Sequence, residues 1–141
     1  MKKNAPWILD LSEVNLEMID SVGGKNASLG EMIQNLDGRG INVPGGFVIT
    51  VAAYKKYIEH NKLENRINDV LKELDVDNIV QLRQAGSHIR NLMSDGEFPK
   101  ELEDEIKSSY KELSQKHGND STDVAVRSSA TAEDLPDASF A

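Results

Sequence analysis

The stretch Val22-Gly23-Gly24-Lys25-Asn26-Ala27-Ser28-Leu29-Gly30 places two glycines and a lysine directly before an apolar pattern. The apolar residues of that pattern recur at i, i+3, i+4 and i+7, as Leu29, Met32, Ile33 and Leu36. This spacing is typical of one face of an α-helix. It predicts a helix from about Ala27, with Lys25 at or just before its first turn.

A lysine at a helix start is a candidate anion site. The first N–H groups of a helix have no partner inside the helix, and the helix dipole is positive there. Paired glycines such as Gly23 and Gly24 let the backbone approach a ligand closely. The combination indicates phosphate binding, although a Walker A loop is excluded because Asn26 stands where that loop needs Ser or Thr. An ordinary glycine-initiated helix with a solvated Lys25 remains the alternative.

Three short apolar segments elsewhere in the chain fit β-strands, and they predict an α+β fold. They lie near Trp7–Leu11, Phe47–Val51 and Asp123–Arg127. Such runs of β-branched and aromatic residues, bounded by turn residues, are typical of strands. We therefore expect a small sheet of these three segments, with the Val124 run buried, covered by about five helices.

Amphipathic stripes predict the remaining helices between these strand segments. Thr50 and Asp77 are candidate N-caps, and Asp95-Gly96 ends a helix. The helix after Thr50 carries Tyr54, Tyr57 and Ile58. We interpret the stripes of the later helices as core; they comprise Leu63, Ile67, Val70, Leu71 and Leu74; Leu82, Ala85, Ile89, Leu92 and Met93; and Leu102, Ile106, Tyr110 and Leu113.

Length and charge restrict the class of protein. A chain of 141 residues fits one ordinary domain. Its net charge of -8 argues against a nucleic-acid partner, which usually requires a basic surface. A small anionic ligand remains possible because a local cluster can be positive. With no cysteine, signal-peptide pattern or long apolar run, we expect a soluble cytoplasmic protein with no membrane partner.

A second polar motif follows the predicted strand at Val124-Ala125-Val126. Arg127 ends that strand, and its planar fork of donors matches phosphate oxygens. The hydroxyls of Ser128, Ser129 and Thr131 add neutral donors. The alternative is an ordinary strand-to-loop transition in which Arg127 pairs with Glu133 or Asp134.

Read together, three motifs resemble those of one enzyme family. They are Gly23–Met32, Val43–Phe47 and Val126–Asp134, and Asp137–Ala141 continues the same pattern. The residues of these motifs and their order resemble those in the N-terminal nucleotide-binding region of the phosphoenolpyruvate synthase (pyruvate, water dikinase) family. Pyruvate phosphate dikinase and rifampin phosphotransferase have a similar nucleotide domain and remain alternatives.

The resemblance implies an ATP-grasp fold, of which residues 1–141 form a truncated part. In the family, residues matching Lys25 and Arg127 contact the phosphates of ATP, and the resemblance gives both a catalytic role. The cofactor-binding set it implies is Gly23, Gly24, Lys25, Arg127, Ser128, Ser129 and Thr131. The loop matching residues 128–141 closes over the phosphates, and its few apolar anchors suggest mobility after about Ser129.

The resemblance also implies a phosphotransferase reaction that this chain does not complete alone. ATP donates its β-phosphate to a histidine on a swivelling domain, and the γ-phosphate is released to water. The phosphohistidine then transfers its phosphoryl group to pyruvate. Ligands of Mg²⁺, the carrier histidine and the pyruvate barrel are expected outside the chain, because His60, His88 and His117 match no motif. The full-length enzyme is expected to be able to form a homodimer. A free-standing phosphate- or nucleotide-binding module, or a helical interaction domain, are the other hypotheses.

Overall fold

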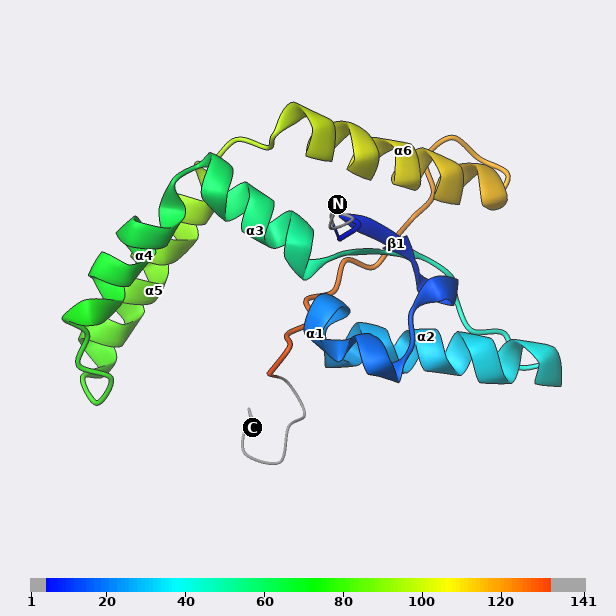
Figure 1. The fold of residues 1–141 in the computed structure, drawn as a ribbon, viewed down its shortest axis with the longest axis horizontal. Coiled ribbons are helices and arrows are strands. Elements are labelled where there is room, and N and C mark those ends of the chain that lie inside the picture. The colour runs from blue at the N-terminus through cyan, green and yellow to red at the C-terminus, as the bar shows by residue number, and fades with distance from the viewer. Residues whose placement is uncertain (1–4, 133–141) are drawn as a thin grey trace. The chain divides into compact units, whose positions relative to one another are not determined.

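The computed structural model describes residues 5–132. In chain order they form β1 (Ile8–Asp10), the 3-10 turns η1 (Leu11–Glu13) and η2 (Leu16–Met18), α1 (Ile19–Val22), α2 (Gly24–Leu36), the 3-10 turn η3 (Asp37–Arg39), β2 (Phe47–Ile49), α3 (Val51–His60), α4 (Leu63–Lys72), α5 (Ile79–Ser94) and α6 (Lys100–Lys116) (Figure 1). This mixture confirms the predicted α+β class. The sequence-based proposals for Glu133, Asp134 and Asp137–Ala141 lie outside the described residues.

The described chain divides into two compact units. The first, which we call the mixed unit, contains residues 5–53 and 101–132; the second, the helical unit, is Tyr54–Lys100. The first phosphate motif and the arginine motif both belong to the mixed unit. That unit therefore carries every residue that the sequence proposes for ligand binding.

A two-stranded antiparallel sheet and α2 build the core of the mixed unit. β1 and β2 pair with Leu9 opposite Val48. The buried cluster consists of Leu11, Val14, Val22, Ala27 and Val48. Thr50 ends the sheet region and caps α3 as predicted, because its hydroxyl oxygen accepts the Ala53 N–H at 3.4 Å. A sheet of only two strands is marginal by itself, so packing against α2 is needed to stabilise it.

The predicted third strand at Asp123–Arg127 is wrong. The segment has no regular secondary structure and belongs to no ladder among the described residues, and Val126 is 93% exposed. The residue just before the segment is held by a side chain rather than by a strand: the Thr122 N–H donates to the Ser114 hydroxyl at 3.2 Å. The β-branched run has strand propensity, but propensity supplies no neighbouring strand to receive its hydrogen bonds.

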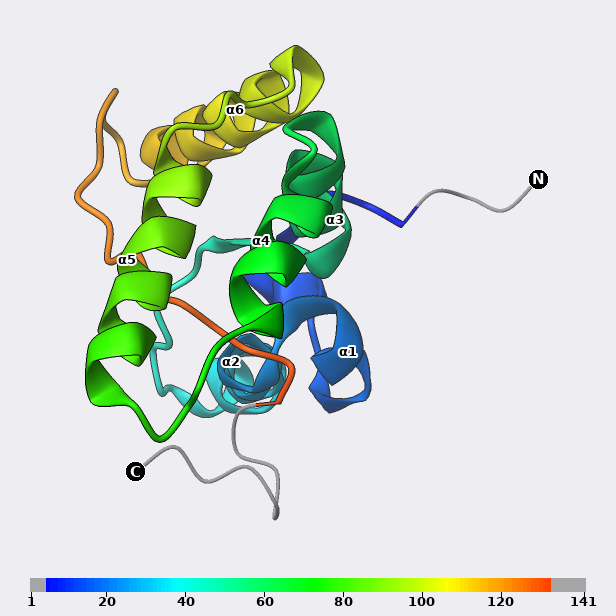
Figure 2. The ribbon, with the colours of Figure 1, turned by 90° about the vertical axis from the view of Figure 1, so that its left-hand side faces the viewer.

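The helical unit is organised around one buried tyrosine. Tyr57 packs with Leu63 and Leu92, and its hydroxyl donates to the Met93 carbonyl at 2.6 Å. The ring of Phe98 lies 5.0 Å from that of Tyr57, centroid to centroid. Figure 2 shows α4 and α5 side by side within this unit. None of the helices formed by the described residues is long and apolar enough to cross a lipid bilayer.

The core predicted for the helical unit is too extensive. Leu71 and Leu82 were predicted to face inward, and both are exposed in the structure. Two helices can bury only the stripe along which they touch, so residues on neighbouring stripes stay at the surface. The cap of α5 is also shifted by one residue from the predicted Asp77, since the Asn78 side chain accepts the N–H groups of Val80 and Gln81.

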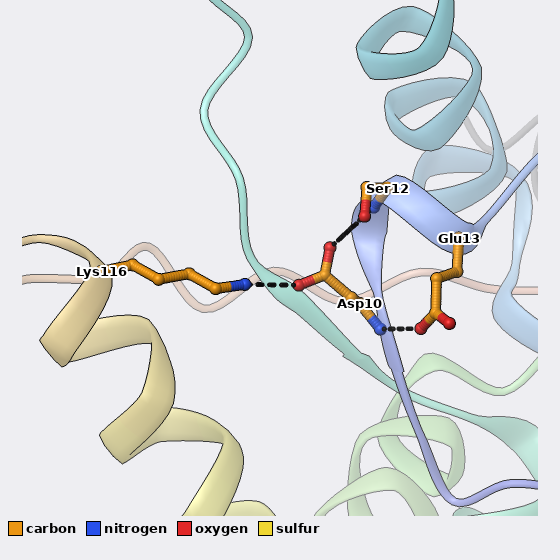
Figure 3. A network of polar contacts seen from close by, with 4 residues as sticks. All are labelled: Asp10, Ser12, Glu13 and Lys116. Carbon is orange, nitrogen blue, oxygen red and sulfur yellow. Dashed lines mark hydrogen bonds and ion pairs between the residues drawn. The ribbon is translucent and has the colours of Figure 1, made fainter.

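A polar network ties the end of α6 to β1 in the mixed unit (Figure 3). One carboxylate oxygen of Asp10 accepts from the Ser12 hydroxyl at 2.6 Å and from its N–H at 2.9 Å. The other oxygen lies 3.1 Å from the Lys116 ammonium. Glu13 completes a capping box by accepting the Asp10 N–H at 3.2 Å. Partial burial alone would raise the pKa of Asp10, but these hydrogen bonds and Lys116 outweigh it and lower the pKa below 3.8.

This network predicts acid sensitivity of the mixed unit. Because the pKa of Asp10 is lower folded than unfolded, its contribution is present above pH 3.8 and is lost as the pH falls through the folded value. Asp10→Asn should therefore flatten the dependence of the unfolding free energy on pH below about 4. The Lys116 pair is exposed, so its share is at most about 1 kcal/mol.

Denaturant titrations at several pH values, followed by the fluorescence of the single tryptophan Trp7 in this unit, provide the measurement. Lys116→Ala should reproduce part of the flattening. Lys111→Ala removes the same charge from an exposed position on the same helix and serves as the control. Parallel pH curves for the wild type and Asp10→Asn would contradict the role assigned to the network.

Candidate functional site

The first phosphate motif lies at the start of α2, as the sequence predicts. The helix begins at Gly24, so Lys25 lies in its first turn and is half-buried. Gly23 precedes the helix as its N-cap residue, with φ of 81° and ψ of 161°. This backbone conformation is essentially restricted to glycine. Gly23 therefore has a conformational role, whatever its role toward a ligand.

The second motif reaches the first through two hydrogen bonds. The Gly24 N–H donates to the Ala130 carbonyl at 3.1 Å, and the Asn26 N–H donates to the Ser129 hydroxyl oxygen at 3.3 Å. In Figure 1 the segment that follows α6 returns past α1 to this point. We call the pair of bonds the clasp. It joins residues that are 103 positions apart in the sequence.

Gly23 also provides the space that the clasp occupies. A Cβ atom at this position would lie 2.3 Å from the Ser129 hydroxyl oxygen and 2.8 Å from the Ser129 carbonyl carbon. Real Cβ atoms do not approach other heavy atoms that closely. The glycine expected to permit close approach of a ligand thus permits close approach of another part of the same chain.

The clasp changes which groups can bind an anion. Two N–H groups in the first turn of α2 already have partners from the chain itself, so the backbone contributes less to an anion site than a bare helix start would. The side chains of Lys25 and Arg127 then supply the main positive charge. Arg127 is exposed and lies two residues before the clasp, while Ser128 and Thr131 are exposed beside it. Convergence of Lys25 and Arg127 on one phosphate group stays a prediction.

No cluster of metal ligands accompanies these residues in the described chain. Within residues 5–132, no three His, Asp or Glu side chains gather in a way that would hold a metal ion.

Two surface hollows lie elsewhere, in the helical unit, and neither includes a proposed site residue. One is lined by Asn65, Asn68, Asp69, Leu71 and Lys72, and the other by Asn61, Leu63, Arg66, Leu92, Asp95 and Gly96.

Sequence reasoning missed two participants in this region. Asn26 was read only as a departure from the Walker A pattern, yet its N–H is held by Ser129 and its side-chain amide donates to the Val22 carbonyl at 2.8 Å. Ala130 was not singled out, because its carbonyl is the contributing atom and its side chain carries no signal. Small residues on both sides of the contact were the available hint, since they allow two chain segments to approach closely.

Comparison with known proteins gives one consistent family. Residues 19–141 match the family model described as pyruvate phosphate dikinase, AMP/ATP-binding domain. Over 139 residues the chain is 48% identical to a phosphoenolpyruvate synthase of Aquifex aeolicus, covering 99% of this chain and 16% of that protein. It is 46% identical over 138 residues to the phosphoenolpyruvate synthase of Escherichia coli, covering 98% of this chain and 17% of that protein.

A third relative agrees with these two in identity and extent. The chain is 50% identical over 135 residues to a phosphoenolpyruvate synthase of Neisseria meningitidis, covering 96% of this chain and 17% of that protein. The chain thus spans about a sixth of the length of these curated relatives.

Proposed function

The chain belongs to the pyruvate phosphate dikinase AMP/ATP-binding domain family, and from this premise we propose that it is the ATP-phosphate-binding opening part of a phosphoenolpyruvate synthase. The substrate assignment rests on relatives at 46–50% identity that carry this name. The overall reaction would convert pyruvate, ATP and water to phosphoenolpyruvate, AMP and phosphate. A phosphohistidine would carry the β-phosphoryl group, and water would take the γ-phosphoryl group.

One structural observation supports this role above the others. The clasp brings the segment that bears Lys25 to the segment that bears Arg127, although 101 residues separate the two cations. One cation about 4 Å from a phosphate oxygen contributes on the order of 4 kcal/mol at an effective dielectric of about 20. Two such groups would also stabilise negative charge that shifts during phosphoryl transfer.

The residues described here fit the phosphates of ATP better than they fit its metal. Lysine and arginine side chains are phosphate ligands, whereas Mg²⁺ requires carboxylate or other oxygen ligands, and none gather in residues 5–132. As part of the same proposal, the Mg²⁺ ligands, the carrier histidine and the pyruvate site lie in parts of the enzyme beyond the matched sixth. An ATP-grasp fold, a cytoplasmic location and a homodimeric full-length enzyme belong to the same proposal.

The proposal predicts weak, phosphate-dependent binding of ATP by this chain. Contacts from Lys25 and Arg127 cannot replace an adenine pocket and metal ligands, so the dissociation constant should be above the micromolar range. Isothermal titration with Mg-ATP measures the affinity. A sub-micromolar constant would contradict the idea that the site is incomplete. The isolated chain should form no phosphoenolpyruvate from ATP and pyruvate.

Nuclear magnetic resonance locates the binding. Millimolar ATP should shift the amide signals of residues 23–26 and 127–131, whereas adenosine, which lacks phosphates, should leave them in place. Lys111→Ala should respond as the wild type does, because this exposed lysine of α6 lies outside the proposed site. Shifts confined to other residues, or equal shifts with adenosine, would refute phosphate binding at this site.

A further inference from the structure

The start of α2 lacks a side chain that would cap it. An N-cap side chain normally accepts the N–H group of the second or third helical residue. Gly23 occupies the N-cap position and has no side chain to do so. Asn26, the third residue of the helix, is the one whose N–H donates to the Ser129 hydroxyl at 3.3 Å. Ser129 therefore makes the hydrogen bond that a serine at position 23 would ordinarily make.

The geometry explains why the cap comes from elsewhere in the chain. With φ of 81° and ψ of 161°, position 23 strongly disfavours any residue that carries a side chain. The point where its Cβ would stand is only 2.3 Å from the Ser129 hydroxyl oxygen. The hydroxyl of Ser129 thus fills the place of the missing cap. The neighbouring Gly24–Ala130 bond fixes the direction from which the segment arrives.

We infer that Ser129 is a positioning residue, which caps α2 from a distance and thereby fixes the Arg127 segment beside Lys25. This role rests on the proposed function in one respect, namely that Arg127 acts on phosphate. It differs from the role suggested by the sequence, in which the Ser129 hydroxyl donates to phosphate directly. Accepting the Asn26 N–H holds the Ser129 hydroxyl at the start of the helix, and the capping role rests on that contact.

Amide exchange in the nucleotide-free protein tests the capping role. Ser129→Ala should speed exchange of the Asn26 N–H by roughly two- to thirty-fold, the range expected for loss of a helix cap. Ser129→Cys keeps the shape with a weaker acceptor and should give an intermediate rate. Ser128→Ala, at the exposed neighbouring position, is the matched control and should leave the Asn26 rate unchanged. An unchanged rate in Ser129→Ala would overturn the inference.

A double-mutant cycle on ATP affinity separates positioning from direct ligation. If Ser129 acts through Arg127, then Ser129→Ala should weaken binding by several-fold in the wild type and by much less in an Arg127→Ala background. If Ser129 binds phosphate itself, the two losses should multiply, and positioning would be refuted. Should the wild type bind no ATP at all, the proposed function fails, while the exchange rates still decide whether Ser129 caps α2.

Discussion

Lys25→Ala and Arg127→Ala are each expected to lower ATP-dependent turnover by about a hundred- to a thousand-fold in a phosphoenolpyruvate synthase that carries this sequence. Removing one preorganised donor from a site where negative charge develops costs about 2.7–4 kcal/mol of transition-state stabilisation. The loss should appear in kcat as well as in KM, because negative charge shifts among the phosphate oxygens in the transition state, and the two cations are expected to stabilise that distribution more than the distribution in bound ATP. Steady-state kinetics with ATP and pyruvate provide the measurement.

Conservative and distant replacements sharpen this test. Arg127→Lys should restore little activity, since a lysine keeps the charge but loses the two-pronged fork. Lys111→Ala removes a lysine from an exposed position of α6 and should leave turnover unchanged. Stability should change by no more than about 0.5 kcal/mol in Arg127→Ala, because Arg127 is exposed. A near-normal kcat in both alanine variants would contradict the proposal that Lys25 and Arg127 bind the phosphates of ATP.

Gly30→Ala should destabilise the mixed unit by about 1–3 kcal/mol, even though alanine is the better helix former. Gly30 lies inside α2, where its backbone passes closely against Val14. A Cβ atom there would lie 2.2 Å from the Val14 carbonyl oxygen and 2.7 Å from its carbonyl carbon. Backbone atoms cannot swing aside as the end of a side chain can, and Val14 is itself fully buried. The helix and the η1–η2 segment must therefore separate.

Gly86→Ala is the matched control for this prediction. Gly86 also lies inside a helix, α5, but a Cβ there would meet only the end of the Arg90 side chain, at 3.2 Å. The arginine can move away, so the usual preference of helices for alanine should stabilise this variant by up to about 1 kcal/mol. Trp7 fluorescence follows the mixed unit, and helical circular dichroism follows the helices of both units, so the helical unit is read from the circular-dichroism change that Trp7 does not report. Stability changes of the same sign in both variants would contradict the packing argument.

Local sequence patterns predicted a helix well where the apolar residues recur along one face of that helix. The helix predicted from about Ala27 begins three residues earlier, at Gly24, and the apolar spacing in that segment continued to Leu36, where the helix ends. The same kind of signal over-predicted burial at Leu71 and Leu82. An apolar stripe shows which side of a helix is suited to packing, whereas the number of neighbouring elements decides how much of that side is covered.

Contacts between distant segments were beyond the reach of those signals. Val124 and Val126 have strand-forming side chains, but a strand also needs a partner with unpaired N–H and C=O groups, and sequence propensity cannot identify one. The clasp depends on a hydroxyl 106 positions after Gly23 and on the backbone carbonyl of an alanine. Every residue has a backbone carbonyl, so the residue type gives no sign that this one is used. The resemblance to a known family linked the two motifs, and the structure supplied the atoms that join them.

The glycines at positions 23 and 30 separate what keeps this region folded from what lets it act. Gly23 is required by the approach of Ser129, and Gly30 by the approach of Val14. A descendant that had lost all activity would still lose stability if either glycine were replaced, whereas on the proposed function it would be free to change Lys25 and Arg127. The glycine pattern is therefore a marker of ancestry and architecture. On the proposed function, Lys25 and Arg127 are the positions to inspect when asking whether a given relative is a working enzyme or a pseudoenzyme.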